Sequence, residues 1–278
     1  MLKQNTYQSE IWDAIFADLS FERIDELLDG NKWHSVGQSP YLKYVIENIK
    51  EDYFIHESGC GIGQWLIYLH KKGYKNLYGL DFAKGTIKAI QQSYPSINFK
   101  YGNITASGYQ DDYFDAIMSW SVIDHLDKSD LERTLDDYRR ILKPDGIVFV
   151  TVPFKNWLFF SPWLVFLRKL LNNTWFKRIF RIKESSQQFK QFYFTKNELS
   201  GLMKSRHFFV EKVLYSGHEF GLSKYVNSHF MNKTKIFLKN KSGRFEGLSK
   251  GGQFICNLLK SMSDRATADE IFFIAIKK

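Results

Sequence analysis

The chain has 278 residues, of which 44% are hydrophobic and 17% aromatic, and its formal net charge at pH 7 is +9. This length and apolar content can bury a large core, which excludes a disordered chain. The two cysteines, Cys60 and Cys256, lie far apart and have no zinc-ligand spacing, which excludes a disulfide framework and a structural zinc site.

Residues 1–50 are predicted to form an N-terminal helical cap, because apolar residues recur at helical spacing from Ile11 to Leu19 and from Tyr41 to Ile49. The first residues lack the cationic segment, apolar stretch and cleavage site of a signal peptide. No apolar run is long enough to cross a bilayer. We therefore expect a cytoplasmic protein that is soluble or peripheral to a membrane.

Residues 51–278 are predicted to form one α/β domain, since short apolar runs alternate with amphipathic stretches from Tyr53 onward. The expected elements are strand 53–57, helix 63–72, strand 76–81, helix 84–93, strand 97–102, strand 114–120, helix 129–142 and strand 146–153. Such alternation is typical of a parallel sheet with helices on both faces.

The alternation stops at Pro153 and resumes near residue 190, so residues 153–190 are predicted to be an insertion. Beyond the insertion, the pattern predicts a helix at 196–205, a strand at 208–214, a polar loop at 240–252, a helix at 254–262 and a last strand near 271–276.

A glycine-rich stretch, ESGCGIG, separates the first expected strand from the first helix of the domain. Glu57 ends the strand, and Gly59, Gly61 and Gly63 follow at alternate positions. Glycines allow a sharp turn and leave room for a ligand against the main chain. The nicotinamide fingerprint G-x-G-x-x-G does not fit in either frame. A tight turn that binds nothing is the alternative interpretation.

A second acidic residue, Asp81, stands where the next strand is expected to end. At the carboxyl edge of a parallel sheet, a carboxylate can accept both hydrogen bonds of a ribose diol. The ring of Phe82 could lie against adenine. Asp81 therefore indicates that a nucleoside binds here, but it does not indicate which reaction the protein catalyses. Alternatively, Asp81 caps the helix that starts near Lys84.

In this order and spacing, the motifs resemble those of the class I S-adenosylmethionine-dependent methyltransferases. The G-x-G-x-G loop, with an acid two positions before it, is similar to the first motif of that family. Further resemblance lies in YGNIT, DDYFDAIMSWSVIDHL, RRILKPDGIVFVTVP and FYFTKNELSGLMKSRHFFVEKV, and it covers roughly residues 50–152 and 190–214.

The resemblance implies a Rossmann-like, mostly parallel seven-stranded sheet of order 3-2-1-4-5-7-6 with helices on both faces. It also implies S-adenosylmethionine as the cofactor, S-adenosylhomocysteine as the product, and no metal. The implied cofactor-binding residues are Glu57, Gly59, Cys60, Gly61, Gly63, Asp81, Phe82, Asn103, Ile104, Ser119 and Trp120. Asn103 departs from the family's usual Asp-Ile pair, although its amide oxygen can still accept a hydrogen bond from adenine.

The sequence assigns no catalytic residue. Most of the catalysis of methyl transfer would come from positioning the acceptor and excluding water. A general base would help only if the acceptor is a hydroxyl. His125, in the loop expected after the fourth strand, is the nearest candidate base. We favour the alternative that His125 has a structural role.

The expected insertion is rich in aromatic and basic residues. Residues 155–183 contain seven basic residues and no acidic one. Three interpretations stay open: a lid over the acceptor pocket, an element that contacts an anionic membrane, and a nucleic-acid surface. The leading prediction is a methyltransferase for a small-molecule or lipid-associated acceptor. An RNA methyltransferase and a nonenzymatic cofactor-binding protein are the alternatives, and the oligomeric state stays open.

Overall fold

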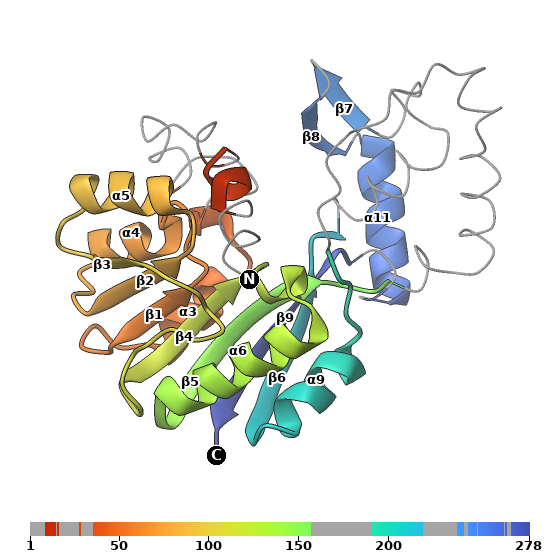
Figure 1. Cartoon of the computed structure of the whole chain (residues 1–278). Helices are drawn as coiled ribbons and strands as arrows, with labels where there is room; N and C mark the ends of the chain where they lie inside the picture. Colours follow the sequence, from red (N-terminus) through yellow and green to blue (C-terminus); the bar gives the residue numbers. More distant parts are fainter. Residues whose placement is uncertain are drawn as a thin grey trace, which may run out of the picture. The chain divides into compact units, whose positions relative to one another are not determined.

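The computed structural model describes residues 9–14, 16, 28, 36–156, 191–218, 238–241, 244–248, 250–263, 265 and 268–278. The chain divides into two compact units (Figure 1). The first unit comprises Met1–Thr151, Leu199–Val213 and Phe272–Lys278, and the second comprises Val152–Glu198 and Leu214–Ile271. The predicted boundary at residue 50 stays a prediction.

The large sheet is mixed, has seven strands and follows the order β3-β2-β1-β4-β5-β9-β6. Its strands are β1 (Ile55–Ser58), β2 (Leu77–Asp81), β3 (Asn98–Tyr101), β4 (Phe114–Trp120), β5 (Leu142–Pro153), β6 (Phe208–Ser216) and β9 (Glu270–Lys277). The pairs β1–β2, β1–β4, β2–β3 and β4–β5 are parallel. Because β9 takes the seventh strand's place between β5 and β6, the predicted Rossmann-like order is confirmed.

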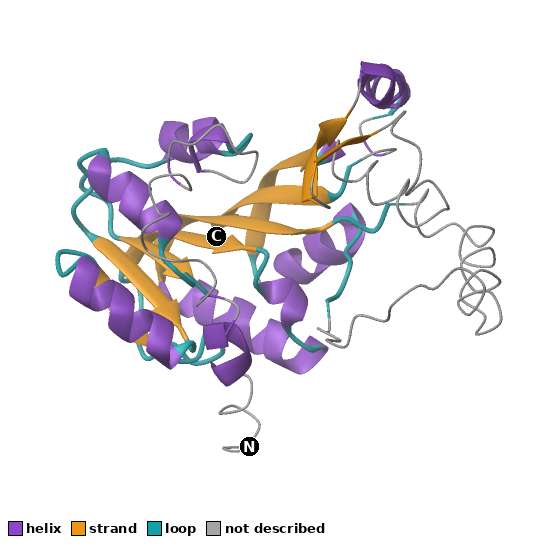
Figure 2. Cartoon of the chain, turned by 90° about the horizontal axis from the view of Figure 1, so that it is seen from above, coloured by secondary structure: helices purple, strands orange, loops and turns teal. Residues whose placement is uncertain are grey.

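Helices lie on both faces of the sheet, as predicted (Figure 2). The helical elements associated with it are η2 (Val36–Gln38), α3 (Leu42–Asn48), α4 (Gln64–Lys71), α5 (Lys84–Ser93), η3 (Ile123–His125), α6 (Lys128–Ile141) and α9 (Lys196–Lys204). β1 is buried throughout, β4 is buried along most of its length, and β5 is buried from Val148 to Pro153. Burial on both faces explains the apolar run of β5 from Ile147 to Val150, which shows no alternation.

An aromatic column forms part of the core of the first unit. Trp65 of α4 stacks on Trp120 at the end of β4, with ring centroids 4.3 Å apart. Tyr41 stacks on Phe272 of β9 at 4.5 Å, and Phe272 also lies 6.0 Å from Trp120. The column therefore fixes the first turn of α4 against the carboxyl end of β4.

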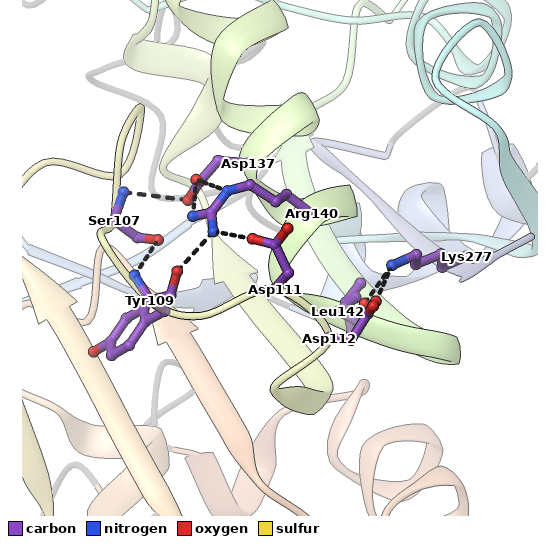
Figure 3. Close-up of polar contacts among 8 residues, drawn as sticks. All are labelled: Ser107, Tyr109, Asp111, Asp112, Asp137, Arg140, Leu142 and Lys277. Atoms are coloured by element: carbon purple, nitrogen blue, oxygen red, sulfur yellow. Dashed lines mark hydrogen bonds and ion pairs between the residues drawn. The ribbon is translucent and has the colours of Figure 1, made fainter.

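The loop that leads into β4 is fastened to α6 through Arg140 (Figure 3). The Nη1 group of Arg140 donates to the Tyr109 carbonyl and to Asp111 Oδ1, both at 2.7 Å. Its Nη2 group donates to Asp137 Oδ1 at 2.6 Å, and Asp137 Oδ2 accepts the Ser107 N–H at 3.2 Å. One guanidinium thus bridges a helix and the loop before a central strand.

The second unit contains an antiparallel pair, β7 (Leu238–Lys241) and β8 (Arg244–Leu248), followed by α11 (Lys250–Met262). The predicted polar loop at 240–252 is therefore wrong, because it contains β8 and the start of α11. These strands are short and rich in charged residues, so they show no clear period-2 pattern. The helix predicted at 254–262 is confirmed.

The predicted insertion at 153–190 lies mostly outside the described residues, since its description ends at Asn156. In the parts of the chain that the structure describes, none of the helices combines the length and apolar character needed to span a bilayer.

Candidate functional site

The glycine-rich loop connects β1 to α4 at the carboxyl edge of the sheet. Gly59, Gly61 and Gly63 have φ angles of 73°, 50° and 68°, in the left-handed region that residues with a Cβ rarely adopt. The N–H groups of Gly59 and Cys60 donate to the Leu80 carbonyl at 2.8 and 3.1 Å. The loop is therefore anchored to the end of β2.

All three positions favour glycine because of their positive φ, and at two of them side chains of the sheet and its helices also leave no room for a Cβ. A Cβ on Gly59 would lie 2.5 Å from the side chain of Val122, and a Cβ on Gly63 would lie 2.6 Å from side chains of α5 and β3. Gly61 differs, because its Cβ would meet the ring of Phe16 at 2.8 Å. Phe16 belongs to the N-terminal segment, so Gly61 faces a part of the chain distant in sequence.

Asp81 ends β2 and holds the glycine-rich loop directly. Its Oδ2 atom accepts the N–H of Gly61 and its Oδ1 atom accepts the N–H of Ala83, each at 2.9 Å. The residue is 7% exposed. Burial raises the pKa of Asp81, and the N–H groups of Ala83 and Gly61 oppose that shift.

The alternative role of Asp81 as the cap of α5 is wrong. A capping side chain bonds N–H groups inside the first turn. Those groups, on Gly85 and Thr86, donate instead to Asp13 of the N-terminal segment at 3.0 and 2.8 Å. On the side of α5, Asp81 accepts the N–H of Ala83, which is the cap residue before the helix and not part of its first turn.

Glu57 lies in β1 next to this loop and is 3% exposed. Burial raises the pKa of Glu57 well above its ordinary value, the N–H of Leu66 opposes the shift, and the negative charge of Asp81 adds to it. Its Oε2 atom is buried and has no hydrogen-bond partner among the described residues. A buried oxygen of this kind fits a donor supplied by a ligand.

The ends of β2 and β3 bring Asn103 to the same edge. Tyr101 pairs with Asp81, and the N–H of Gly102 donates to the Asp81 carbonyl at 3.0 Å. The exposed Asn103 follows, and its Oδ1 atom accepts the N–H of Thr105 at 3.0 Å. Phe82 and Ile104 are half-buried at the ends of these two strands.

At the end of β4, Ser119 is fully buried and Trp120 is half-buried. The Nε1 atom of Trp120 is inaccessible to solvent and has no hydrogen-bond partner within the described chain. The predicted cofactor residues thus come from the carboxyl ends of four neighbouring strands. Their role in binding stays a prediction.

His125 ends η3, just after β4. Its Nε2 atom lies 3.7 Å from Oδ2 of the fully buried Asp124, and its side chain is 23% exposed. The ring of Trp12 meets His125 edge-on, with centroids 5.2 Å apart. These contacts are compatible both with a structural role and with a role as a general base, so the role of His125 stays a prediction.

The sequence reasoning did not include the N-terminal segment in the site. Trp12 contacts His125, Phe16 contacts Gly61, and Asp13 bonds the start of α5. The available signal was the aromatic pair at i and i+4, Trp12 and Phe16, whose rings stack with centroids 5.7 Å apart. The apolar spacing from Ile11 to Leu19 predicts a helix but not the surface that the helix covers.

The proteins and the family model that this chain resembles are described as methyltransferases. Residues 55–146 match a family model described as a methyltransferase domain. A probable S-adenosylmethionine-dependent methyltransferase of Mycolicibacterium smegmatis is 28% identical over 139 residues, which are 50% of this chain and 51% of that protein. Phosphoethanolamine N-methyltransferase 1 of Arabidopsis thaliana is 30% identical over 140 residues, 48% of this chain and 27% of that protein. The chain thus covers about half or less of these relatives.

Among solved structures, a geranyl diphosphate C-methyltransferase of Streptomyces coelicolor A3(2), crystallised with S-adenosyl-L-homocysteine, has a TM-score of 0.58. The alignment covers 93% of this chain and 83% of that one at 11% identity. At this identity, the similarity establishes the fold.

Proposed function

We propose, on the premise that this chain contains a class I S-adenosylmethionine-dependent methyltransferase domain, that it transfers a methyl group to a small-molecule or lipid-associated acceptor. The observation that carries the proposal is the 2.9 Å hydrogen bond from the Gly61 N–H to Asp81. It joins the glycine-rich loop to the acid of the next strand, in a sheet with the strand order of this family.

The residues at this edge fit S-adenosylmethionine, which supplies an electrophilic methyl group when bound. The carboxylate of Asp81 would accept hydrogen bonds from the ribose diol. The buried Oε2 of Glu57 would accept a hydrogen bond from the ammonium of the amino-acid tail. Phe82 and Asn103 would contact adenine, and the missing side chain of Gly61 would leave space for the tail.

The other task of the chain is to orient the acceptor and exclude water. The indole N–H of Trp120, buried and unpartnered among the described residues, could donate a hydrogen bond to a polar acceptor group. If the acceptor is a hydroxyl, His125 would take its proton, and the carboxylate of Asp124, 3.7 Å away, would stabilise the resulting imidazolium.

The acceptor class is supported by the name of one relative and by the charge and aromatic content of this chain. One relative is named for phosphoethanolamine. Residues 155–183 combine aromatic and basic side chains, and the chain carries a net charge of +9. Positive charge beside aromatics suits an acceptor that bears phosphate or lies at an anionic membrane.

Calorimetric titration with S-adenosylhomocysteine tests the cofactor site. We expect binding by the parent protein and an affinity weaker by about tenfold or more in Asp81→Asn, because the hydroxyl groups lose a charged acceptor. Asp52→Asn, which changes an exposed aspartate in the turn before β1, is the matched control and should bind like the parent. The cofactor assignment fails if the parent does not bind or if Asp81→Asn binds equally well.

Transfer of a tritiated methyl group to panels of phosphorylated amines, lipid extracts and RNA tests the acceptor class. Cosedimentation with anionic liposomes, compared between the parent and a Trp157→Ala/Trp163→Ala double variant, tests membrane contact. If RNA becomes labelled while the small molecules and lipids do not, the proposed acceptor class is wrong and the RNA methyltransferase alternative takes its place.

A further inference from the structure

The described N-terminal segment, residues 9–14 and 16, is bound to the start of α5 by one carboxylate. Asp13 Oδ1 accepts the N–H and the hydroxyl of Thr86, both at 2.8 Å, and Oδ2 accepts the N–H of Gly85 at 3.0 Å. The residue at the cap position of α5 is Ala83, whose side chain cannot accept a hydrogen bond. Asp13 therefore caps α5 from a distant part of the sequence, and its negative charge is favourable at the helix N-terminus.

A second anchor lies one helical turn earlier. Ser9 is 7% exposed, and its hydroxyl donates to the carbonyl of Phe82 at 2.7 Å. The same oxygen lies 3.4 Å from the N–H of Lys84, which donates to it. The segment is thus bonded to the residues that directly follow Asp81.

The segment also covers the glycine-rich loop. Phe16 Cζ lies 2.8 Å from the position that a Cβ on Gly61 would take, so the ring stands on the side that this glycine leaves open. Asp81 and Glu57, the two acids of the site, are only 7% and 3% exposed. A ligand cannot approach the Gly61 backbone on that side while Phe16 stands there.

We propose that residues 9–14 and Phe16 form a gate that competes with the cofactor for part of its site, with Phe16 as the plug and Asp13 as the latch. This inference rests on the proposed function, because the space beside Gly61 is the one assigned to the cofactor tail. Only molecules with the gate open bind the cofactor, so a closed gate weakens the apparent affinity and slows association. Loss of the latch raises the open fraction.

Stopped-flow and calorimetric measurements with S-adenosylhomocysteine test the gate. Asp13→Ala removes three hydrogen bonds, and we expect association about tenfold faster or more, with a similar gain in affinity. Phe16→Ala removes the plug and should show the same gain with the latch intact. Glu10→Ala, which removes an exposed carboxylate from the same segment, should match the parent.

Hydrogen exchange without ligand gives an independent measurement. In Asp13→Ala, the amides of residues 9–16 and of Gly85 and Thr86 should lose protection, whereas Glu10→Ala should keep it. Thr86→Val removes only the hydrogen bond from the Thr86 hydroxyl to Asp13, so it should cause a smaller loss of protection in the same amides. This variant tests the gate if Asp13→Ala does not fold.

Two results would overturn the gate alone: unchanged association in Asp13→Ala and Phe16→Ala, or faster dissociation without faster association. The second would mean that the segment closes over bound cofactor and does not compete with it. Failure of the parent to bind S-adenosylhomocysteine would instead overturn the proposed function, and the gate with it.

Discussion

Acid is expected to destabilise this protein through His56, a residue of β1 that is 1% exposed. Its ring stacks on Phe114 with centroids 4.9 Å apart and meets Tyr109 edge-on at 5.1 Å. Burial lowers the pKa of His56 from 6.5 to about 4, although the hydrogen bond with the Tyr78 carbonyl opposes the shift.

The sign of the effect follows from proton binding. Above the unfolded pKa, the imidazole is neutral in both states and has no effect on the pH dependence. As the pH falls below it, the unfolded chain binds a proton that folded His56 does not, so stability is lost until His56 titrates near its folded pKa of about 4. The full loss is about 3 kcal/mol, and about 2 kcal/mol is lost between roughly pH 7.5 and pH 5.

Urea unfolding at about pH 7.5 and pH 5 measures this loss in the parent and in His56→Gln, which has an amide and no titrating group. The variant should lose about 2 kcal/mol less than the parent on acidification. The raised pKa values of Glu57 and Asp81 act in the opposite direction in both proteins, so the difference isolates His56. His70→Gln, at the end of α4, controls for loss of an imidazole. Equal losses in the parent and His56→Gln would refute the reasoning.

Three further predictions concern the fold and the acceptor. Gly63→Ala should lower the free energy of unfolding by about 2 kcal/mol or more, measured by urea unfolding, because it combines a positive φ with overpacking against buried side chains. Arg140→Ala should cost about 1 kcal/mol, a value reduced because Arg140 is 36% exposed, whereas Arg133→Ala, which breaks a surface pair, should change stability by less than about 0.5 kcal/mol. Trp120→Phe keeps a ring against Trp65 but loses the buried N–H, so KM for a polar acceptor should rise while the melting temperature stays close to that of the parent.

The sheet could be predicted from the sequence because its central strands are short, buried and separated by amphipathic helices. The candidate site could also be predicted to a large extent. In a parallel sheet, the carboxyl ends of neighbouring strands meet at one edge, so the loop after β1 and the acid ending β2 must lie close together. The hydrogen bond between Gly61 and Asp81 is the direct consequence of that topology.

Long-range pairing decides the elements that were predicted less well. β5 begins at Leu142, earlier than the strand expected from residue 146, although Pro144 and Gly146 suggested a turn. Its register with β4 is irregular there, since Phe114 pairs with Leu142 and Ala116 with Ile147. Asp145, with a φ of 59°, interrupts the extended backbone where Pro144 and Gly146 suggested a turn, and only the pairing of Leu142 with Phe114 extends β5 beyond it.

The N-terminal segment was missed for a related physical reason. Rules for helix capping examine the residue directly before a helix, and at α5 that residue is Ala83. A helix that begins without a polar cap leaves N–H groups that another part of the chain or water must satisfy. The sequence offered Asp81 as the cap, whereas in the structure the distant residue Asp13 satisfies these N–H groups. Because α5 follows Asp81, a segment recruited to cap this helix necessarily lies beside the candidate cofactor site.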